Sequence, residues 1–157
     1  SRQIYRTNPL PSVCGRVCTH KCESVCALRH RGEPVAIRWL KRYALDNIEP
    51  EKLKEIVKEN VIKKNGRKVA IVGAGPAGLA CAYYLVLMGY KITIYEIMPQ
   101  AGGTMRYGIP EYRLPYAALD RDIALIKSLG VEIIRNTEVG KDISLDKIFS
   151  DFDAVFS

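Results

Sequence analysis

The chain has 157 residues, of which 48% are hydrophobic and 26% are charged, and its formal net charge is +7. This balance is normal for a globular protein and argues against an intrinsically disordered chain. The charge is uneven, because residues 1–68 carry 16 Lys and Arg against 7 Asp and Glu, whereas residues 69–157 carry 8 against 10. The sequence therefore predicts two parts, residues 1–66 and residues 67–157.

Residues 69–90 form an uncharged stretch of 22 residues, which is long enough for a membrane-spanning helix. Five of them are Gly or Pro, and the stretch divides into strand, turn and helix, so we expect no membrane segment. The opening residues lack the apolar core of a signal peptide. Four of the five cysteines are crowded between positions 14 and 26, unlike a secreted disulfide framework. We therefore expect a cytoplasmic protein.

Two helices are expected in the basic part. The first begins at Pro34. Its expected buried side chains are Val35, Ile37, Leu40, Tyr43 and Ala44. The second follows Pro50, covers residues 51–64 and ends at Asn65-Gly66. Its apolar residues recur at spacings of three and four, and those expected to be buried are Leu53, Ile56, Val57 and Val61.

The apolar pattern changes after residue 67. Short runs rich in β-branched residues are typical of buried parallel strands, and they alternate here with longer helical segments. Strands are predicted at residues 68–73, 91–96, 131–134 and 153–156, helices at 77–88 and 116–129, and an ordered loop at 97–114. The fold class is therefore α/β: a partial, doubly wound, Rossmann-like parallel sheet preceded by a small helical, cysteine-rich segment. Because the sequence stops inside the last predicted strand, we expect a fragment of a longer protein.

The turn after the first strand matches a dinucleotide-binding fingerprint and consists of Gly73, Ala74, Gly75, Pro76, Ala77 and Gly78. The first glycine permits a tight turn, the second lets a pyrophosphate approach the backbone, and the third lets the helix lie close to the strand. The positive end of that helix then faces the phosphates. The alternative is a glycine-rich turn in a sheet that binds no nucleotide.

Glu96 ends the second predicted strand, 18 residues after Gly78. Its carboxylate can accept hydrogen bonds from the hydroxyls of an adenosine ribose and would repel a 2′-phosphate. The site is therefore predicted to prefer FAD or NAD over NADP. The alternative is a solvated carboxylate at a strand end.

A second candidate site consists of four cysteines at a regular interval of four, namely Cys14, Cys18, Cys22 and Cys26. Thiolates at this density bind zinc or iron–sulfur clusters, although the Cys-x2-Cys pairs usual in zinc sites are absent. On a continuous helix the same residues would line one face as small apolar side chains. Cys81 lies within a predicted helix and is expected only to pack.

Taken together, the two motifs resemble the glutamate synthase small-subunit family of iron–sulfur/FAD NAD(P)H oxidoreductases. Its relatives include the electron-input part of dihydropyrimidine dehydrogenase and the large subunit of NADH-dependent ferredoxin–NADP oxidoreductase. The most specific stretches are residues 8–18, 33–43, 73–78, 101–103 and 106–115. The resemblance implies that NAD(P)H, bound outside this fragment, reduces FAD. Electrons then pass through [4Fe–4S] clusters to a larger catalytic or electron-accepting subunit, most closely one like glutamate synthase.

The resemblance also implies roles for individual residues. The implied FAD contacts are Gly73 to Ala77, Glu96, Gly103, Thr104, Arg113 and the backbone near Val139. Cys18, Cys22 and Cys26 match cluster ligands, whereas the position of Cys14 is not always one. Lys41 stands where some members have a further, non-cysteine ligand. No catalytic side chain is expected, because protein groups here bind and orient cofactors that carry the redox chemistry.

Two other functions remain open on the sequence. One is an NAD-binding dehydrogenase with a structural zinc knuckle, which metal analysis would distinguish by zinc in place of iron and sulfide. The other is a nucleic-acid-binding module built on the basic part, where only Trp39 and Tyr43 could stack on bases. We expect no nucleic-acid partner and an intact protein that is an oxidoreductase.

Overall fold

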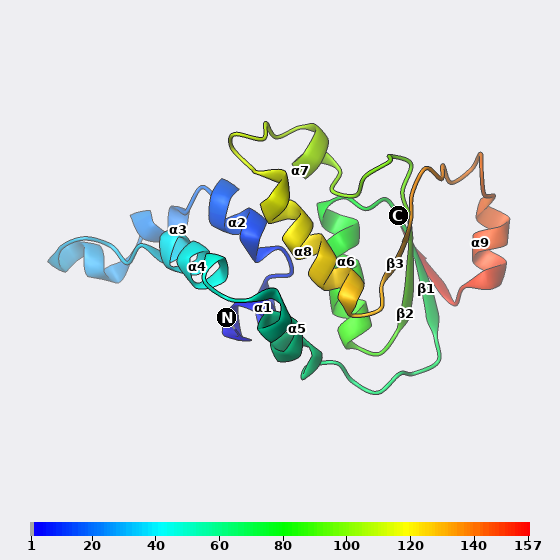
Figure 1. The fold of residues 1–157 in the computed structure, drawn as a ribbon, viewed down its shortest axis with the longest axis horizontal. Helices are drawn as coiled ribbons and strands as arrows, with labels where there is room; N and C mark the ends of the chain where they lie inside the picture. The colour runs from blue at the N-terminus through cyan, green and yellow to red at the C-terminus, as the bar shows by residue number, and fades with distance from the viewer. Residues whose placement is uncertain (1) are drawn as a thin grey trace.

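Four parallel strands form one sheet in the part of the chain that the computed structural model describes, residues 2–157 (Figure 1). The strands are β1 (Lys68–Val72), β2 (Lys91–Tyr95), β3 (Glu132–Ile134) and β4 (Ala154–Phe156), in the order β3-β2-β1-β4. Ile71 at the centre of the sheet pairs with Ile94 on one side and Phe156 on the other. Strands are added on one side of β1 up to β3 and on its other side at β4. This reversal of strand order places a ligand crevice at the carboxyl ends of β1 and β4.

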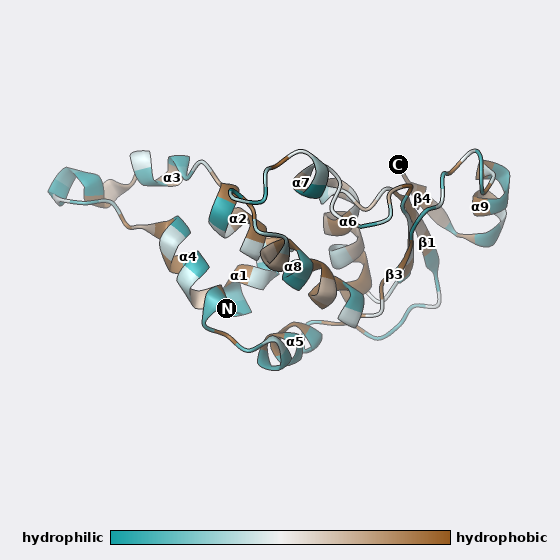
Figure 2. Ribbon diagram, turned by 45° about the horizontal axis from the view of Figure 1, so that its top comes forward, coloured by the Kyte–Doolittle hydropathy of each residue, from teal (hydrophilic) through white to brown (hydrophobic). Residues whose placement is uncertain are grey.

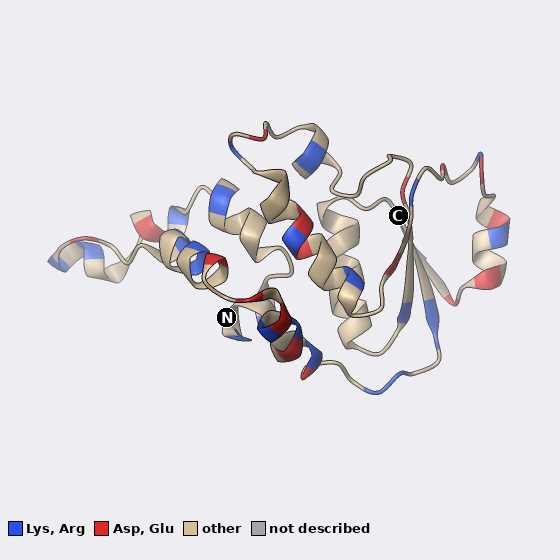
Figure 3. Cartoon of the chain, viewed as in Figure 1, with Lys and Arg blue, Asp and Glu red and all other residues tan. Residues whose placement is uncertain are grey.

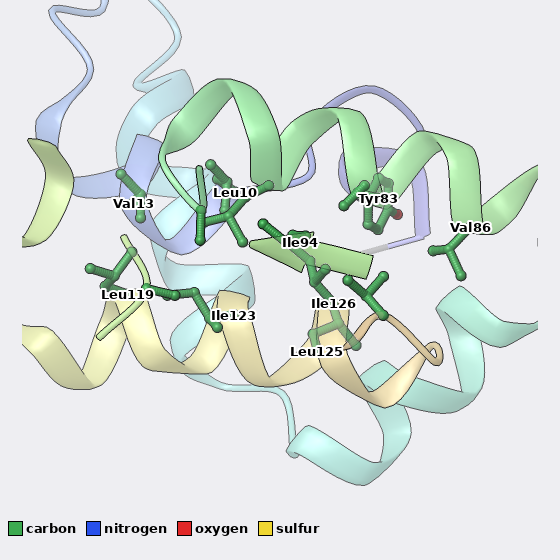
Figure 4. Close-up of a cluster of buried hydrophobic side chains, with 14 of the residues drawn as sticks. Leu10, Val13, Tyr83, Val86, Ile94, Leu119, Ile123, Leu125 and Ile126 are labelled. Carbon is green, nitrogen blue, oxygen red and sulfur yellow. The ribbon is translucent and has the colours of Figure 1, made fainter. Parts of the chain in front are cut away.

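Both faces of the sheet are covered, as the predicted doubly wound architecture requires. Helices α6 (Pro76–Leu87) and α8 (Tyr116–Ser128) cover one face, and α9 (Leu145–Asp151) lies on the other (Figure 1). Side chains alternate between these faces. Ile94 points to the first face, between Tyr83 of α6 and Ile126 of α8 (Figure 4), whereas Tyr95 and Ala70 form a second cluster with α9. The predicted α/β fold class is confirmed.

Short helices make up the cysteine-rich part. They are α1 (Arg2–Thr7), α2 (Pro11–Val17), α3 (Lys21–Ser24), the 3-10 helix η1 (Ala27–Arg31), α4 (Ile37–Asp46) and α5 (Pro50–Lys58). Helices α2 and α5 contact α8, whereas α3 and η1 extend away from the body (Figure 1). Tyr5, Leu45 and Leu53 are fully buried in the same core as the residues of α6 and α8. The two parts of the sequence therefore share one hydrophobic core.

Polar contacts also join the two parts. Asp122, buried on α8, accepts hydrogen bonds from the backbone N–H groups of Ser12 (2.9 Å) and Val13 (3.1 Å) in the first turn of α2. The Tyr83 hydroxyl of α6 donates to the Tyr5 carbonyl at 2.6 Å. Asp122 thus acts as a cap for α2 that comes from a distant part of the sequence, and it satisfies N–H groups that have no partner within the helix.

The prediction for the buried face of α4 is wrong at two positions. Leu40 and Tyr43 are 58% and 70% exposed, whereas Leu45 is the fully buried residue of this helix. Val35, Ile37 and Ala44 are half-buried. The helix is apolar on two sides, and packing against α2 rather than periodicity selects the side that is covered.

Other elements also differ from the predictions: α4 begins at Ile37 rather than at Pro34, and helix α9 was not predicted. Helix α5 ends at Lys58, six residues early, because the backbone that follows bonds to the end of α6: the Ile62 N–H donates to the Leu87 carbonyl at 2.8 Å. Leu53 and Val57 are buried as predicted, Ile56 is half-buried and Val61 is 37% exposed. The predicted loop 97–114 contains one helical turn, α7 (Thr104–Tyr107).

Charge and hydropathy follow this architecture. Apolar residues gather in the sheet and along α6, which carries no charged residue, while α3 and α5 are largely hydrophilic (Figure 2). Lys and Arg are spread over α2, α4 and the connection that leads to β1 (Figure 3). Within residues 2–157, no helix has the length and apolar character needed to cross a membrane. The uncharged stretch at 69–90 is instead β1, a turn and α6.

The buried position of Asp122 predicts a pH-dependent stability. Burial raises the pKa of this carboxyl to about 7, against the lowering effect of the Ser12 and Val13 N–H groups. A pKa raised in the folded state means that stability is highest below the unfolded value near 3.8 and falls as pH rises to 7. The free energy of unfolding should therefore decrease by at most about 1.4 kcal/mol per pH unit in this window.

Asp122→Asn should remove this pH dependence of the free energy of unfolding, because an amide cannot ionise. Urea denaturation of both proteins at pH 5 and pH 8 measures it: the variant should gain stability relative to wild type at the higher pH. An equal difference between the two proteins at both pH values would contradict the expectation.

Candidate functional site

The glycine turn follows β1 directly and leads into α6. Gly73 has φ +91°, a conformation that favours glycine, and its N–H donates to the Tyr95 carbonyl of β2 at 2.7 Å. A methyl group on Gly78 would collide with the Gly73 carbonyl oxygen. Gly78 therefore allows the first turn of α6 to lie directly on the end of β1.

The first turn of α6 faces the crevice at the carboxyl ends of the strands. Gly75 precedes the helix, and Pro76 occupies its first turn, where a missing N–H has no cost. The N–H groups of Ala77 and Gly78 cannot bond within the helix. Together with the helix dipole they form the kind of site that binds a phosphate group.

Glu96 lies immediately after β2 and is only 4% exposed. Its Oε2 accepts a hydrogen bond from the Ala74 N–H of the glycine turn at 2.6 Å, and its Oε1 accepts from the Met98 N–H at 2.8 Å. Each carboxylate oxygen accepts one of these hydrogen bonds and has capacity to accept another, such as one from a ribose hydroxyl. The carboxylate thus connects the turn to the segment after β2, a contact that the sequence did not reveal.

A second backbone segment packs against the turn. The Gly102 N–H donates to the Ala74 carbonyl at 2.8 Å. Gly103 has φ +51°, and a Cβ on it would come within 2.7 Å of the Gly75 Cα. Gly103 and Thr104, implicated by the family resemblance alone, therefore lie beside the turn that the fingerprint identified. Gly102, which belongs to the specific stretch 101–103 but was not among the implied FAD contacts, makes the connecting hydrogen bond.

The segment that contains Val139 approaches the same place through its backbone. The Thr137 N–H donates to the Glu96 carbonyl at 2.9 Å. Val139 itself is half-buried and forms an isolated bridge with Ile143. The structure therefore places the backbone near Val139 close to Glu96, and the role of Val139 in cofactor binding stays a prediction.

Arg113 occupies a different environment. Its side chain is exposed and lines a hollow of about 210 Å³ between the cysteine-rich part and the loop before α8. The other residues of this hollow are Gly15, Arg16, Arg38, Trp39, Arg42, Tyr112 and Pro115. Arg38 and Arg42 lie over the Trp39 ring at 4.5 and 5.7 Å from its centre. Four arginines line the hollow, two of which, Arg16 and Arg42, pair with Asp46. Arg113 shares this hollow with Gly15 and Arg16 and therefore faces the cysteine segment.

The four cysteines lie in three different local structures. Cys14 is on α2 and half-buried, exposed Cys18 ends α2, exposed Cys22 is on α3, and Cys26 precedes η1. Burial raises the pKa of the Cys14 thiol, whereas backbone N–H groups of Val35 and Leu28 lower the pKa of the Cys26 thiol. The cysteines therefore do not line one face of a continuous helix.

The donor set does not fit a complete metal site within this chain. Among residues 2–157, no group of three or more His, Cys, Asp or Glu side chains is arranged to hold a metal ion. A zinc ion or a cubane cluster needs about four converging ligands. Assignment of the four cysteines as metal ligands stays a prediction, and any such site would need further donors.

Taken together, the fold and the turn define a Rossmann-like nucleotide-binding unit preceded by a cysteine-rich helical segment. Comparison with known protein families agrees for both parts. Residues 1–53 match the family described as "dihydropyrimidine dehydrogenase domain II, 4Fe-4S cluster". Residues 71–119 match the NAD(P)-binding Rossmann-like domain.

Curated relatives match over nearly the whole chain. The β subunit of NADPH-Fe(3+) oxidoreductase of Geobacter sulfurreducens is 51% identical over 99% of the chain, which spans 23% of that protein. The β subunit of NADP(+)-dependent formate dehydrogenase of Moorella thermoacetica is 42% identical over 98%, and the chain spans 24% of it. The small chain of glutamate synthase [NADPH] of Escherichia coli is 40% identical over 97%, and the chain spans 32% of it.

The chain thus covers about a quarter to a third of the length of these relatives. The resemblance predicted from the sequence is confirmed: the chain is a homologue of glutamate synthase small subunits and related NAD(P)H oxidoreductase subunits.

Substitutions of Gly75 and Gly78, the two glycines at the start of α6, should have different effects. Gly75→Ala should leave stability within about 0.5 kcal/mol of wild type, because the added methyl group would find its nearest neighbour, the Gly103 Cα, at 3.9 Å. It should nevertheless weaken dinucleotide binding about tenfold or more, since the methyl group would occupy the space predicted for the pyrophosphate.

Gly78→Ala should instead destabilise the fold by about 1–3 kcal/mol, because the collision lies between backbone atoms that have little room to move. Thermal unfolding and a dinucleotide titration of both variants provide the measurements. Equal loss of stability in the two variants would contradict these assignments.

Proposed function

We propose that this chain carries the FAD-binding turn and the iron–sulfur segment of an NAD(P)H-dependent oxidoreductase subunit. The observation that carries the proposal is the buried Glu96 carboxylate, bonded to the Ala74 N–H inside the glycine turn. It brings a ribose acceptor next to a phosphate-binding helix end, in the arrangement that an adenosine diphosphate group requires.

The choice of FAD over a nicotinamide cofactor rests on charge. The ADP group is common to both, so the turn itself does not discriminate. Glu96 disfavours the 2′-phosphate of NADPH, yet the names of the relatives given above specify NADPH or NADP. We therefore propose that the nicotinamide binds elsewhere in the whole protein and that FAD occupies the turn.

The residues of this chain would then have binding and orienting roles. The N–H groups of Ala77 and Gly78 hold the pyrophosphate, and Glu96 accepts hydrogen bonds from the ribose. Gly103, Thr104 and the backbone near Val139 extend toward the flavin, and Arg113 is proposed to approach it from the hollow beside the cysteine segment. When bound, FAD supplies the conversion between hydride transfer and single-electron transfer.

The cysteine segment is proposed to contribute ligands to [4Fe–4S] clusters that donors outside this chain complete. The match of residues 1–53 to a 4Fe-4S family supports this choice over a zinc knuckle. Matches to oxidoreductases over both parts also leave nucleic-acid binding without support. The positive hollow around Arg113 lies between the cysteine segment and the loop before α8, which suits a path between anionic redox centres.

The remaining proposals concern organisation. We propose residues 1–66 as the helical iron–sulfur segment and residues 67–157 as the start of the FAD-binding domain. A larger catalytic or electron-accepting partner, like that of glutamate synthase, is proposed because the relatives are named as small chains or β subunits. Cysteines without disulfides suit a reducing compartment such as the cytoplasm.

Anaerobic purification of the full-length protein, followed by flavin, iron, acid-labile sulfide and zinc analysis, tests the proposal. FAD together with stoichiometric iron and sulfide is the expected result. Zinc without sulfide, with NAD in place of FAD, would support the dehydrogenase with a zinc knuckle instead.

Glu96→Gln provides a sharper test of the ribose contact. Loss of the charge should weaken FAD retention by about 1–3 kcal/mol, the usual value of a charged hydrogen bond. It should also reduce the discrimination against 2′-phosphorylated adenosine ligands, since the repulsion is removed. Flavin content after extensive dialysis and competition by 2′-phospho-ADP-ribose provide the measurements. Unchanged flavin content and unchanged competition would refute the assignment of Glu96.

A further inference from the structure

Arg106 holds the 101–104 loop to α8 in three ways. Its side chain, on α7, is only 10% exposed, and its Nε donates to the Ala101 carbonyl at 2.8 Å. Its guanidinium forms an ion pair with Asp120 of α8 and lies over the Tyr116 ring, 5.1 Å from the ring centre. One side chain thus connects the loop to the first turns of α8.

The same loop has little freedom on its α8 side. A Cβ on Gly102 would lie 2.9 Å from the Leu119 Cδ2 and 3.1 Å from the Arg106 Cβ. The Tyr116 hydroxyl also donates to the Arg106 carbonyl at 3.4 Å, a long contact. The loop therefore fits between α8 and the glycine turn, with Arg106 immediately behind Gly102.

On its other side the loop contacts the candidate dinucleotide site. The Gly102 N–H bonds to the Ala74 carbonyl, and Gly103 lies against Gly75. Any displacement of the loop would therefore be transmitted to the backbone that receives the pyrophosphate. Binding sites of this kind depend on contacts behind them that fix their geometry.

We infer that Arg106 and Asp120 form a brace that positions the 101–104 loop against the glycine turn and so sets the affinity for the dinucleotide. Arg106 is a positioning residue, because it acts on the glycine turn only through the 101–104 loop. The affinity part of this inference rests on the proposed function, whereas the loop position does not depend on any ligand.

A matched control exists on the same helix. Arg121 is also a part-buried arginine that donates to a backbone carbonyl, that of Ile48, on the side of α8 away from the loop. Arg121→Gln removes the same charge and the same kind of contact. It should lower stability without affecting the 101–104 loop.

Hydrogen exchange in the ligand-free full-length protein tests the brace directly. Arg106→Gln should increase exchange of the Gly102 amide, which donates to the Ala74 carbonyl, about tenfold, the value of one charge-assisted hydrogen bond, whereas Arg121→Gln should leave it unchanged. Asp120→Asn should give a smaller increase. Because Asp120 is 58% exposed, this variant folds even if Arg106→Gln does not. Wild-type exchange rates at the loop in Asp120→Asn and Arg106→Gln would overturn the inference.

FAD titration of the same proteins tests the effect on affinity. Arg106→Gln should raise the Kd about tenfold, with partial rescue in Arg106→Lys, which keeps the charge, and wild-type Kd in Arg121→Gln. An equal loss of FAD affinity in Arg106→Gln and Arg121→Gln would show a general loss of stability and would overturn the brace. A wild-type protein that binds no FAD would refute the proposed function and the affinity effect, while the exchange result would still decide the brace.

Discussion

The absence of a side chain at Gly78 is the constraint on which the rest of the arrangement depends. It lets α6 lie on the end of β1 and directs the first turn of α6 into the crevice between β1 and β4. With α6 so placed, α8 packs beside it, and α2 and α5 pack on α8. A β-carbon at this one position would separate helix from strand and displace each of these layers in turn.

Helix α8 connects the two candidate sites. Asp120 holds the 101–104 loop through Arg106, and Asp122, two residues later, caps the helix that carries Cys14. The two carboxylates differ in their surroundings, since Asp120 is largely exposed and Asp122 is fully buried. The glycine turn and the start of the cysteine segment are therefore positioned relative to one helix, an arrangement consistent with the proposed electron transfer between two cofactors.

The positive charge of the cysteine-rich part is also organised by the fold. Arg16 and Arg42 share Asp46, and Arg38 donates to the Cys18 carbonyl at 3.3 Å. These side chains converge with Arg113 on one hollow, although they are far apart in the sequence.

The sequence by itself determined the strands, helices α6 and α8, the glycine turn and Glu96, because each depends on a local period or on spacing along one βαβ unit. Only the tertiary structure decided which side of α4 is covered, where α5 ends, that Asp122 caps α2 and that Arg113 faces the cysteine segment. The four cysteines show the same division. Their spacing indicated metal ligation, but only the fold placed them in three different local structures. Local pattern specifies which elements form, whereas packing between distant segments selects among faces and partners that are locally equivalent.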